Sequence, residues 1–81
     1  MTIGLLIQKK RAEAKLTQHQ LANKLGWNSA QFVSNIERGT AQLPHTYMRK
    51  VAQVLNIPAS TLMNTYLSEY KEKIAKEAGL K

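Results

Sequence analysis

Apolar residues recur at intervals of three and four along most of this chain, the spacing that brings them to one face of an α-helix. Leu21, Ala22 and Leu25 follow this spacing, and so do Val33 and Ile36. No segment has the strict alternation of apolar and polar residues that a half-buried strand requires. The pattern therefore predicts five helices, over about residues 3–15, 18–25, 30–38, 45–55 and 60–78.

Polar caps and glycines mark the ends of these helices. Thr17 followed by Gln20 forms a capping-box pattern, in which each side chain accepts a hydrogen bond from the other residue's backbone N–H. Gly26 and Gly39 stand where the second and third helices should end, since glycine adopts the left-handed conformation at low cost. The other predicted N-caps are Thr2, Ser29 and Ser60. The joints are short, without a linker or a repeat, and indicate one compact all-α domain of five helices over residues 1–81.

Positive charge is concentrated in the first two thirds of the chain. The formal net charge is +7; residues 1–57 carry eight Lys or Arg against two Glu, whereas residues 58–81 carry four against three. Such an excess of basic residues favours a polyanionic partner such as nucleic acid. A solvated basic surface without a partner is the alternative.

The composition argues against several classes of protein. The absence of cysteine excludes disulfides and thiolate metal sites, and it suits a reducing cytoplasm. Two histidines and five glutamates, with no aspartate, make no metal site. No phosphate loop, nucleophile elbow or zinc-binding spacing occurs. We therefore expect no enzyme activity, no catalytic residue, no metal, no cofactor and no small-molecule ligand.

The sequence also lacks the marks of a membrane or secreted protein. No apolar run approaches the roughly 18 residues that span a bilayer. At the N-terminus the apolar residues precede Lys9, Lys10 and Arg11, the reverse of the order in a secretory signal. A cytoplasmic location without membrane contact is expected.

The second and third predicted helices have the spacing of a helix-turn-helix, with N-caps at Thr17 and Ser29 and a turn of a few residues between them. A small residue is needed where these two helices cross closely, and Ala22 supplies it. Gly26 ends the first helix of the pair sharply. An ordinary helical hairpin would share the apolar spacing but would not need both Ala22 and Gly26.

The residues that carry this pattern resemble the phage-repressor and Cro-like helix-turn-helix family, of the xenobiotic-response-element type. They are Leu16, Thr17, Gln18, Leu21, Ala22, Leu25, Gly26, Ser34, Asn35, Ile36, Glu37, Arg38 and Gly39. The resemblance covers about residues 3–58. One difference is that Trp27 and Asn28 separate Gly26 from Ser29, where the commonest pattern of the family has one residue. We expect this longer turn to rotate or shift the third helix.

The resemblance implies that the protein binds double-stranded DNA with its third helix in the major groove. The positions that face base edges in the family are occupied here by Ala30, Gln31, Ser34 and Asn35. Gln and Asn carry a donor and an acceptor that match adenine N6 and N7, and an Ala methyl suits the thymine methyl. For Gln31 and Asn35 the alternative is a solvated polar face.

Contacts to the DNA backbone are implied for a second set of residues. Gln18 resembles the family glutamine that binds a phosphate and braces the base-reading residues. The other phosphate candidates are Lys24, Asn28, Arg38, Thr40 and Gln42, followed by Lys9, Lys10, Arg49 and Lys50. For these residues a solvated surface position is the alternative.

Four further positions are assigned to structure. Arg11 and Glu37 resemble the family's partly buried ion pair, which ties the first helix to the end of the third. Trp27 is expected to cover the joint of the helix-turn-helix, with stacking on DNA as the alternative. Phe32 is expected in the core, with contact to a thymine methyl or a sugar as the alternative.

The last predicted helix, residues 60–78, carries an apolar stripe that is longer than a core of this size needs. Most homo-oligomers are two-fold symmetric, and a palindromic operator mirrors that symmetry. We therefore expect Tyr66, Tyr70 and Ile74 to form the seam of a homodimer. Packing of this stripe onto the first helix is the alternative.

These expectations lead to two candidate functions. The first is a sequence-specific transcriptional repressor that acts as a dimer on a palindromic operator. The alternative is an antitoxin-type interaction protein that binds a partner protein and regulates its own promoter. An architectural DNA binder is disfavoured because Gln31 and Asn35 stand where Lys or Arg would serve it better.

Overall fold

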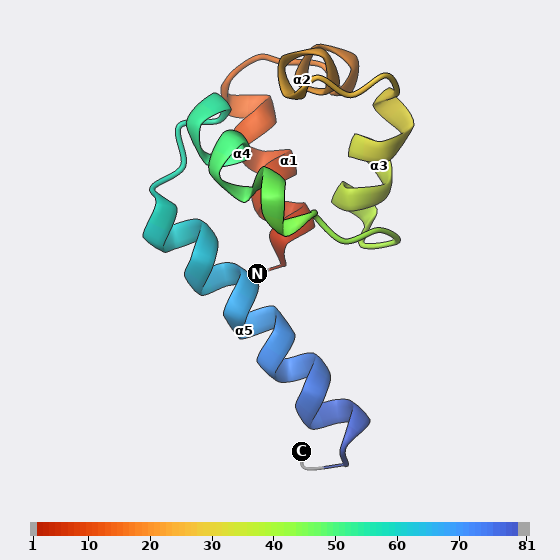
Figure 1. Cartoon of the computed structure of the whole chain (residues 1–81), viewed down its shortest axis with the longest axis vertical. Helices are drawn as coiled ribbons and strands as arrows, with labels where there is room; N and C mark the ends of the chain where they lie inside the picture. The colour runs from red at the N-terminus through yellow and green to blue at the C-terminus, as the bar shows by residue number, and fades with distance from the viewer. Residues whose placement is uncertain (1, 80–81) are drawn as a thin grey trace.

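The computed structural model describes residues 2–79, which fold into helices joined by short turns. The helices are α1 (Ile3–Glu13), α2 (Gln18–Leu25), α3 (Ala30–Arg38), α4 (Met48–Val54) and α5 (Ala59–Glu77), with a short 3-10 helix, η1 (His45–Tyr47), before α4. Helices α1 to α4 gather into a globule and α5 runs away from it (Figure 1). No strand occurs in residues 2–79, and the predicted five-helix fold is confirmed. None of these described helices is both long and hydrophobic enough to cross a membrane.

Local hydrogen bonds form most helix ends as the sequence predicts. Thr17 Oγ1 accepts from the Gln20 N–H at 3.0 Å, and Gln20 Oε1 accepts from the Thr17 N–H at 2.8 Å, which completes the capping box. The Ser29 hydroxyl accepts from a backbone N–H in the first turn of α3 at 3.0 Å. Gly26 and Gly39 end α2 and α3 with φ of +78° and +83°, in the left-handed region that a Cβ disfavours.

Several helix ends differ from the prediction. The fourth helix was predicted from residue 45, but α4 begins at Met48 because residues 45–47 form the 3-10 helix η1. The predicted cap Ser60 is wrong, because α5 already begins at Ala59 and its N-cap is Pro58, which makes no side-chain capping bond. Proline lacks an N–H and has a fixed φ, so it suits the entry of a helix, where the N–H groups have no intrahelical partner. Helix α1 ends at Glu13, before the predicted limit, since Lys15 adopts a φ of +59° and turns the chain.

The hydrophobic core lies between the first four helices and the start of α5. Helix α2 packs against α3 and α4, and α1 packs against α3. Leu21 and Leu25 of α2, Val33 of α3 and Val51 of α4 are each only 1% exposed. Burial of such side chains stabilises a fold by about 1.5–3 kcal/mol each. The inward side of α3 is therefore fixed by packing, and its opposite side faces solvent.

Helix α5 consists of a packed part and a projecting part. Leu62 is buried in the core. Farther along, Glu69 Oε2 accepts from the N–H of Ile3 at 2.8 Å and so ties α5 to the start of α1. The helix then continues beyond the globule (Figure 1), where Tyr70 and Ile74 are 51% and 45% exposed. Packing of α5 against α1 and α4 therefore buries Leu62 but leaves the apolar row from Met63 to Ile74 about half exposed.

Helices α1 and α3 come into contact through their backbones at Gly4. This residue is buried in α1 and faces the carbonyl groups at the end of α3. A Cβ at this position would stand 2.6 Å from the Glu37 carbonyl oxygen and closer still to that of Ile36. Because both obstacles are backbone atoms, a side chain at position 4 would force the two helices apart.

Gly4→Ala should therefore destabilise the fold by about 1–3 kcal/mol, the usual cost of overpacking a tight contact. This cost should outweigh the gain in helix propensity of about 1 kcal/mol. In a domain of this size, thermal unfolding followed by circular dichroism should show a Tm lower by roughly 4–8 °C per kcal/mol. Gln8→Ala, at an exposed position of the same helix, is the control and should change stability by less than about 0.5 kcal/mol. An unchanged Tm for Gly4→Ala would contradict the close approach of α1 and α3.

Candidate nucleic-acid interface

Helices α2 and α3 are joined by a tight turn over residues 26–29. The N–H groups of Gly26 and Trp27 donate to the carbonyls of Asn23 and Ala22 at 3.1 and 2.9 Å, and these bonds close α2. The apolar side chains that hold the pair together are each at most 3% exposed: Leu21, Leu25, Val33 and Ile36. The chain therefore contains the predicted pair of crossed helices around a short turn (Figure 1).

Trp27, one of the two residues between Gly26 and Ser29, packs against the core. The Trp27 ring is half-buried and lies 4.7 Å from the Phe32 ring and 5.1 Å from the Tyr47 ring, measured between centroids. Trp27 thus joins the turn to α3 and to η1. The predictions that Trp27 covers the joint and that Phe32 packs in the core are both confirmed.

The solvent-facing side of α3 carries a connected row of polar side chains. Asn35 Oδ1 accepts from Gln31 Nε2 at 3.0 Å and from Arg38 Nη2 at 2.7 Å. Gln31 and Arg38 are exposed, and Asn35 is half-buried. The other two predicted base-reading residues, Ala30 and Ser34, are half-buried on the same helix. The structure thus brings three of the predicted DNA-contacting side chains into one hydrogen-bonded row.

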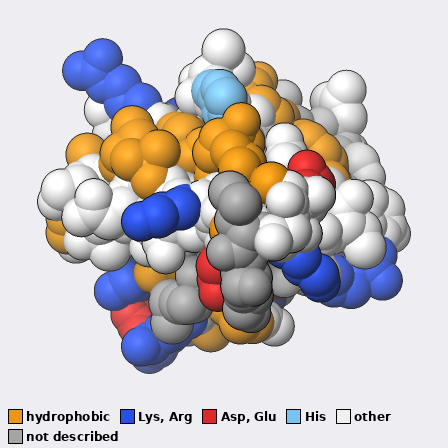
Figure 2. Space-filling view, turned by 90° about the horizontal axis from the view of Figure 1, so that it is seen from below, with side chains coloured by type: hydrophobic (Ala, Val, Ile, Leu, Met, Phe, Trp, Pro, Cys, Tyr) orange, Lys and Arg blue, Asp and Glu red, His pale blue; other side chains and the backbone are white. Residues whose placement is uncertain are grey.

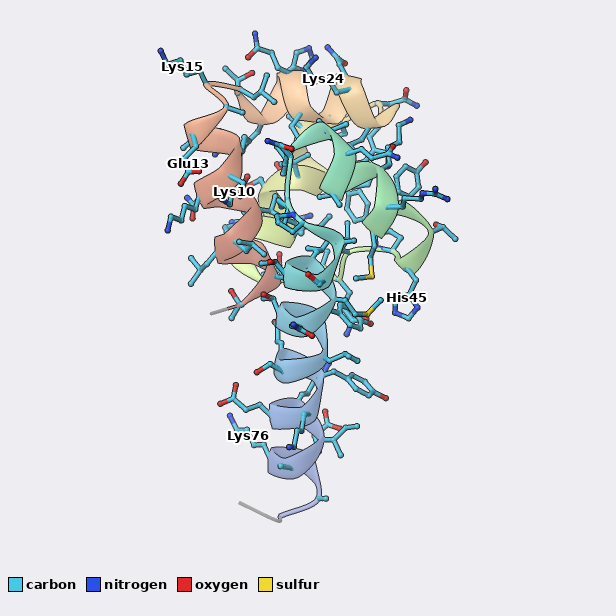
Figure 3. All side chains as sticks on the ribbon, turned by 90° about the vertical axis from the view of Figure 1, so that its left-hand side faces the viewer. Lys10, Glu13, Lys15, Lys24, His45 and Lys76 are labelled. Atoms are coloured by element: carbon cyan, nitrogen blue, oxygen red, sulfur yellow. The ribbon has the colours of Figure 1, made fainter. Side chains whose placement is uncertain are left out.

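The phosphate candidates outside α3 lie at several places. Lys24 is exposed in the last turn of α2, and Asn28 is exposed in the turn that follows. Lys24 stands at one end of the molecule and Lys76 of α5 at the other (Figure 3). Thr40 is exposed after α3 and donates its hydroxyl to the Asn35 carbonyl oxygen at 3.1 Å. Gln42 lines a hollow of about 260 Å³ whose opposite wall belongs to α5, so it lies beside that helix.

A buried carboxylate connects α1, α2 and α3. Glu37 is only 6% exposed, and its Oε2 accepts from Arg11 Nε at 2.6 Å, while its Oε1 accepts from Arg11 Nη2 at 3.2 Å and from Gln18 Nε2 at 3.0 Å. Arg11 also donates from Nη1 to the Leu16 carbonyl oxygen at 2.8 Å. The predicted ion pair is confirmed. The amide nitrogen of Gln18 braces Glu37, whereas the resemblance implied that Gln18 braces the base-reading residues.

Lys50 of α4, which the sequence indicates only as a secondary phosphate candidate, lies beside the turn of the helix-turn-helix. Its Nζ atom is 3.8 Å from the point that a Cβ on Gly26 would occupy, so the ammonium group is beside the turn. The next residue, Val51, is buried, and Lys50 itself is exposed. The apolar pattern of α4 could have predicted that exposure, but it could not predict which neighbouring element the side chain meets.

A family model for the helix-turn-helix of the Cro/C1 type matches residues 7–62, which is more than half of the chain. The chain belongs to this family. The family consists of DNA-binding transcription regulators, and the resemblance noted in the sequence is thereby confirmed. No curated protein matches the sequence as a relative.

Membership in the Cro/C1 family makes this chain a DNA-binding transcription regulator. In a helix-turn-helix the second helix of the pair lies in the major groove, and the first crosses the DNA backbone. Here α3 is that second helix, and Glu37 anchors its end to α1 and α2. The family match ends at residue 62, so all of α5 from Met63 onward lies outside it. The match therefore does not explain the projecting part of this helix.

Arg11→Met should destabilise this Cro/C1-type domain by about 3–5 kcal/mol, because it leaves the Glu37 carboxylate buried without its cation. The side chains of Arg11 and Glu37 are 16% and 3% exposed. Lys10→Met is the matched control, since Lys10 pairs with Glu13 at 3.5 Å and these side chains are 32% and 53% exposed. Its loss should be about 1 kcal/mol or less. Urea unfolding measures both, and equal losses would contradict the role given to Glu37.

Proposed function

We propose that this regulator is a sequence-specific repressor that binds a palindromic operator as a dimer, with α3 in the major groove. The observation that carries the proposal is the exposed face of α3, which offers neutral hydrogen-bonding groups on a helix whose other side is buried. Neutral amides discriminate between base pairs, whereas lysine and arginine on phosphates do not read sequence. This face therefore supports a specific reader over an architectural binder.

In this proposal the residues that contact DNA divide into two groups. The first approaches base edges and comprises Ala30, Gln31, Ser34 and Asn35. The second approaches phosphates and comprises Gln18, Lys24, Asn28, Arg38, Thr40 and Gln42. Lys50 joins the second group because its ammonium lies beside the turn. The net charge of +7 favours such contacts with a polyanion.

Dimerisation is supported by the exposed apolar face of α5. Met63, Leu67, Tyr70 and Ile74 are 45–51% exposed and are spaced by four, three and four residues. This is the alternation of apolar positions in a two-helix coiled coil. Seen along α5, hydrophobic side chains gather on one side of the molecule (Figure 2). A monomer leaves this row in water.

The spacing of the row is self-complementary for two antiparallel copies of α5. When the pair is centred between Leu67 and Tyr70, Leu67 meets Tyr70 of the second copy, and Met63 meets Ile74 of the second copy. Tyr66, the remaining residue of the predicted seam, is half-buried and stacks with Tyr70 at 6.5 Å between centroids. In the proposed dimer Tyr66 would therefore pack behind Tyr70, on the side of the row that faces the core. A dimer of this kind on a promoter blocks transcription by occupancy.

Selection from random DNA duplexes with the whole chain tests this function. A dimeric repressor should enrich two inverted half-sites whose centres are about 10–10.5 base pairs apart, or a multiple of that spacing. Enrichment of one unpaired half-site would contradict the dimer. Binding without any enriched sequence would contradict specific recognition and would support an architectural role.

Ile74→Asp should convert the dimer into a monomer by placing a charge in the apolar row. Light scattering after gel filtration should show a lower molar mass, and affinity for the palindrome should fall far more than affinity for a half-site. Ser68→Asp adds the same charge at an exposed position on another side of α5 and should leave the dimer intact. Circular dichroism should show that both variants keep their helical fold.

A wild-type chain that is monomeric both free and on DNA would contradict this assembly. The exposed row on α5 would then favour the antitoxin-type alternative, in which another protein covers the helix. Co-purification from the native host with a stoichiometric small protein, lost in Ile74→Asp and kept in Ser68→Asp, would identify that alternative.

A further inference from the structure

Three side chains on the exposed side of α3 form a chain of hydrogen bonds with a fixed direction. Gln31, Asn35 and Arg38 are spaced by four and three residues, so they share one face of the helix. Both outer side chains donate to the central Asn35 Oδ1, from Gln31 Nε2 at 3.0 Å and from Arg38 Nη2 at 2.7 Å. An amide oxygen has two lone pairs, and here both are used.

The chemistry of the guanidinium group sets the orientation of both amides. A guanidinium only donates, so the atom of Asn35 that faces Arg38 must be its oxygen. This oxygen only accepts, so Gln31 must turn its –NH₂ group toward it. If the Gln31 amide were turned over, its oxygen would face the Asn35 oxygen without a proton between them. Arg38 therefore determines the orientation of the Gln31 amide through Asn35.

The orientation leaves a defined edge of Gln31 free. Its Oε1 accepts no bond from the described residues, and its Nε2 has a second N–H beyond the one given to Asn35. The free acceptor and the free donor stand side by side, which is the pair of groups that matches adenine N6 and N7 in the major groove. Asn35 cannot form the same pair of bonds to a base, since its acceptor already serves two donors.

We propose that Asn35 is a positioning residue that orients the Gln31 amide for adenine, and that Arg38 holds Asn35 in this role. The inference rests on the proposed function, and it assigns the adenine contact to Gln31 alone. It also deepens that function, because a side chain held in its binding geometry before DNA arrives loses less conformational freedom on binding. The remaining –NH₂ group of Asn35 only donates, so it is free for an acceptor on the DNA.

Discrimination at single base pairs tests the proposal. The base pair read by Gln31 is the one at which Gln31→Ala loses preference, and the wild-type chain should prefer adenine there by about five- to 150-fold. Asn35→Leu removes the acceptor and should lose most of this preference at the same base pair. Asn35→Asp retains an acceptor for both Gln31 and Arg38. It should keep the adenine preference while binding all duplexes more weakly, because its charge repels phosphates.

A double variant separates positioning from direct reading. At the base pair read by Gln31, the combination of Gln31→Ala with Asn35→Leu should discriminate no worse than Gln31→Ala alone, because both changes remove the same contact. Full adenine preference retained by Asn35→Leu at the base pair read by Gln31 would overturn the proposal. So would loss of preference in Asn35→Asp. Thermal unfolding of each variant confirms that the domain is folded. Absence of any preferred sequence for the wild-type chain would instead overturn the proposed function itself.

Discussion

The carboxylate of Glu37 is the point at which α1, α2 and α3 are held together. It lies in the last turn of α3, is nearly fully buried, and receives hydrogen bonds from Arg11 of α1 and Gln18 of α2. A charge in such a place is strongly destabilising unless its partners are present. The arrangement therefore favours the one packing of the three helices in which Arg11 and Gln18 both reach the carboxylate. This packing determines which side of α3 is exposed to solvent.

The neighbours of Glu37 in the sequence show how closely support and recognition are connected. Ile36 is buried beside it, while Asn35 and Arg38 form the exposed hydrogen-bonded row. Four consecutive residues thus point to the core, to the buried ion pair and to solvent. A small rotation of α3 about its axis would disturb all three environments at once. The polar row therefore depends on contacts made on the opposite side of the helix.

Features set by local chemistry could be predicted from the sequence. The capping box of Thr17 and Gln20 and the left-handed glycines at positions 26 and 39 depend on residues a few positions apart, and the structure has them. The pairing of Arg11 with Glu37 spans 26 residues and was predicted only through the family resemblance. The Ser60 hydroxyl is not used as a cap, because the backbone conformation of Pro58 already starts α5 without a side-chain capping bond.

Features that depend on tertiary geometry could not be predicted in the same way. The bond from the Ile3 N–H to Glu69 joins residues 66 apart, and no periodicity in the sequence connects them. The partner of Gln18 depends on where α3 ends relative to α2, which spacing alone does not determine. Asn35 and Gln31 are alike as candidates in the sequence, since both carry an amide. Only the position of the Arg38 guanidinium makes one of them the support of the other.

Because α5 is one continuous helix, an insertion or deletion within it changes the direction of its exposed apolar face. One uninterrupted helix carries Leu62, which is fixed in the core, and Ile74, which is exposed beyond it. Each residue added between these positions would lengthen the helix by about 1.5 Å and turn its exposed end by about 100°. A single insertion would thus aim the apolar face elsewhere, whereas an insertion of seven or eleven residues would nearly restore its direction. We therefore expect changes in the length of this segment to preserve the direction of the apolar face only when they add or remove a whole helical repeat.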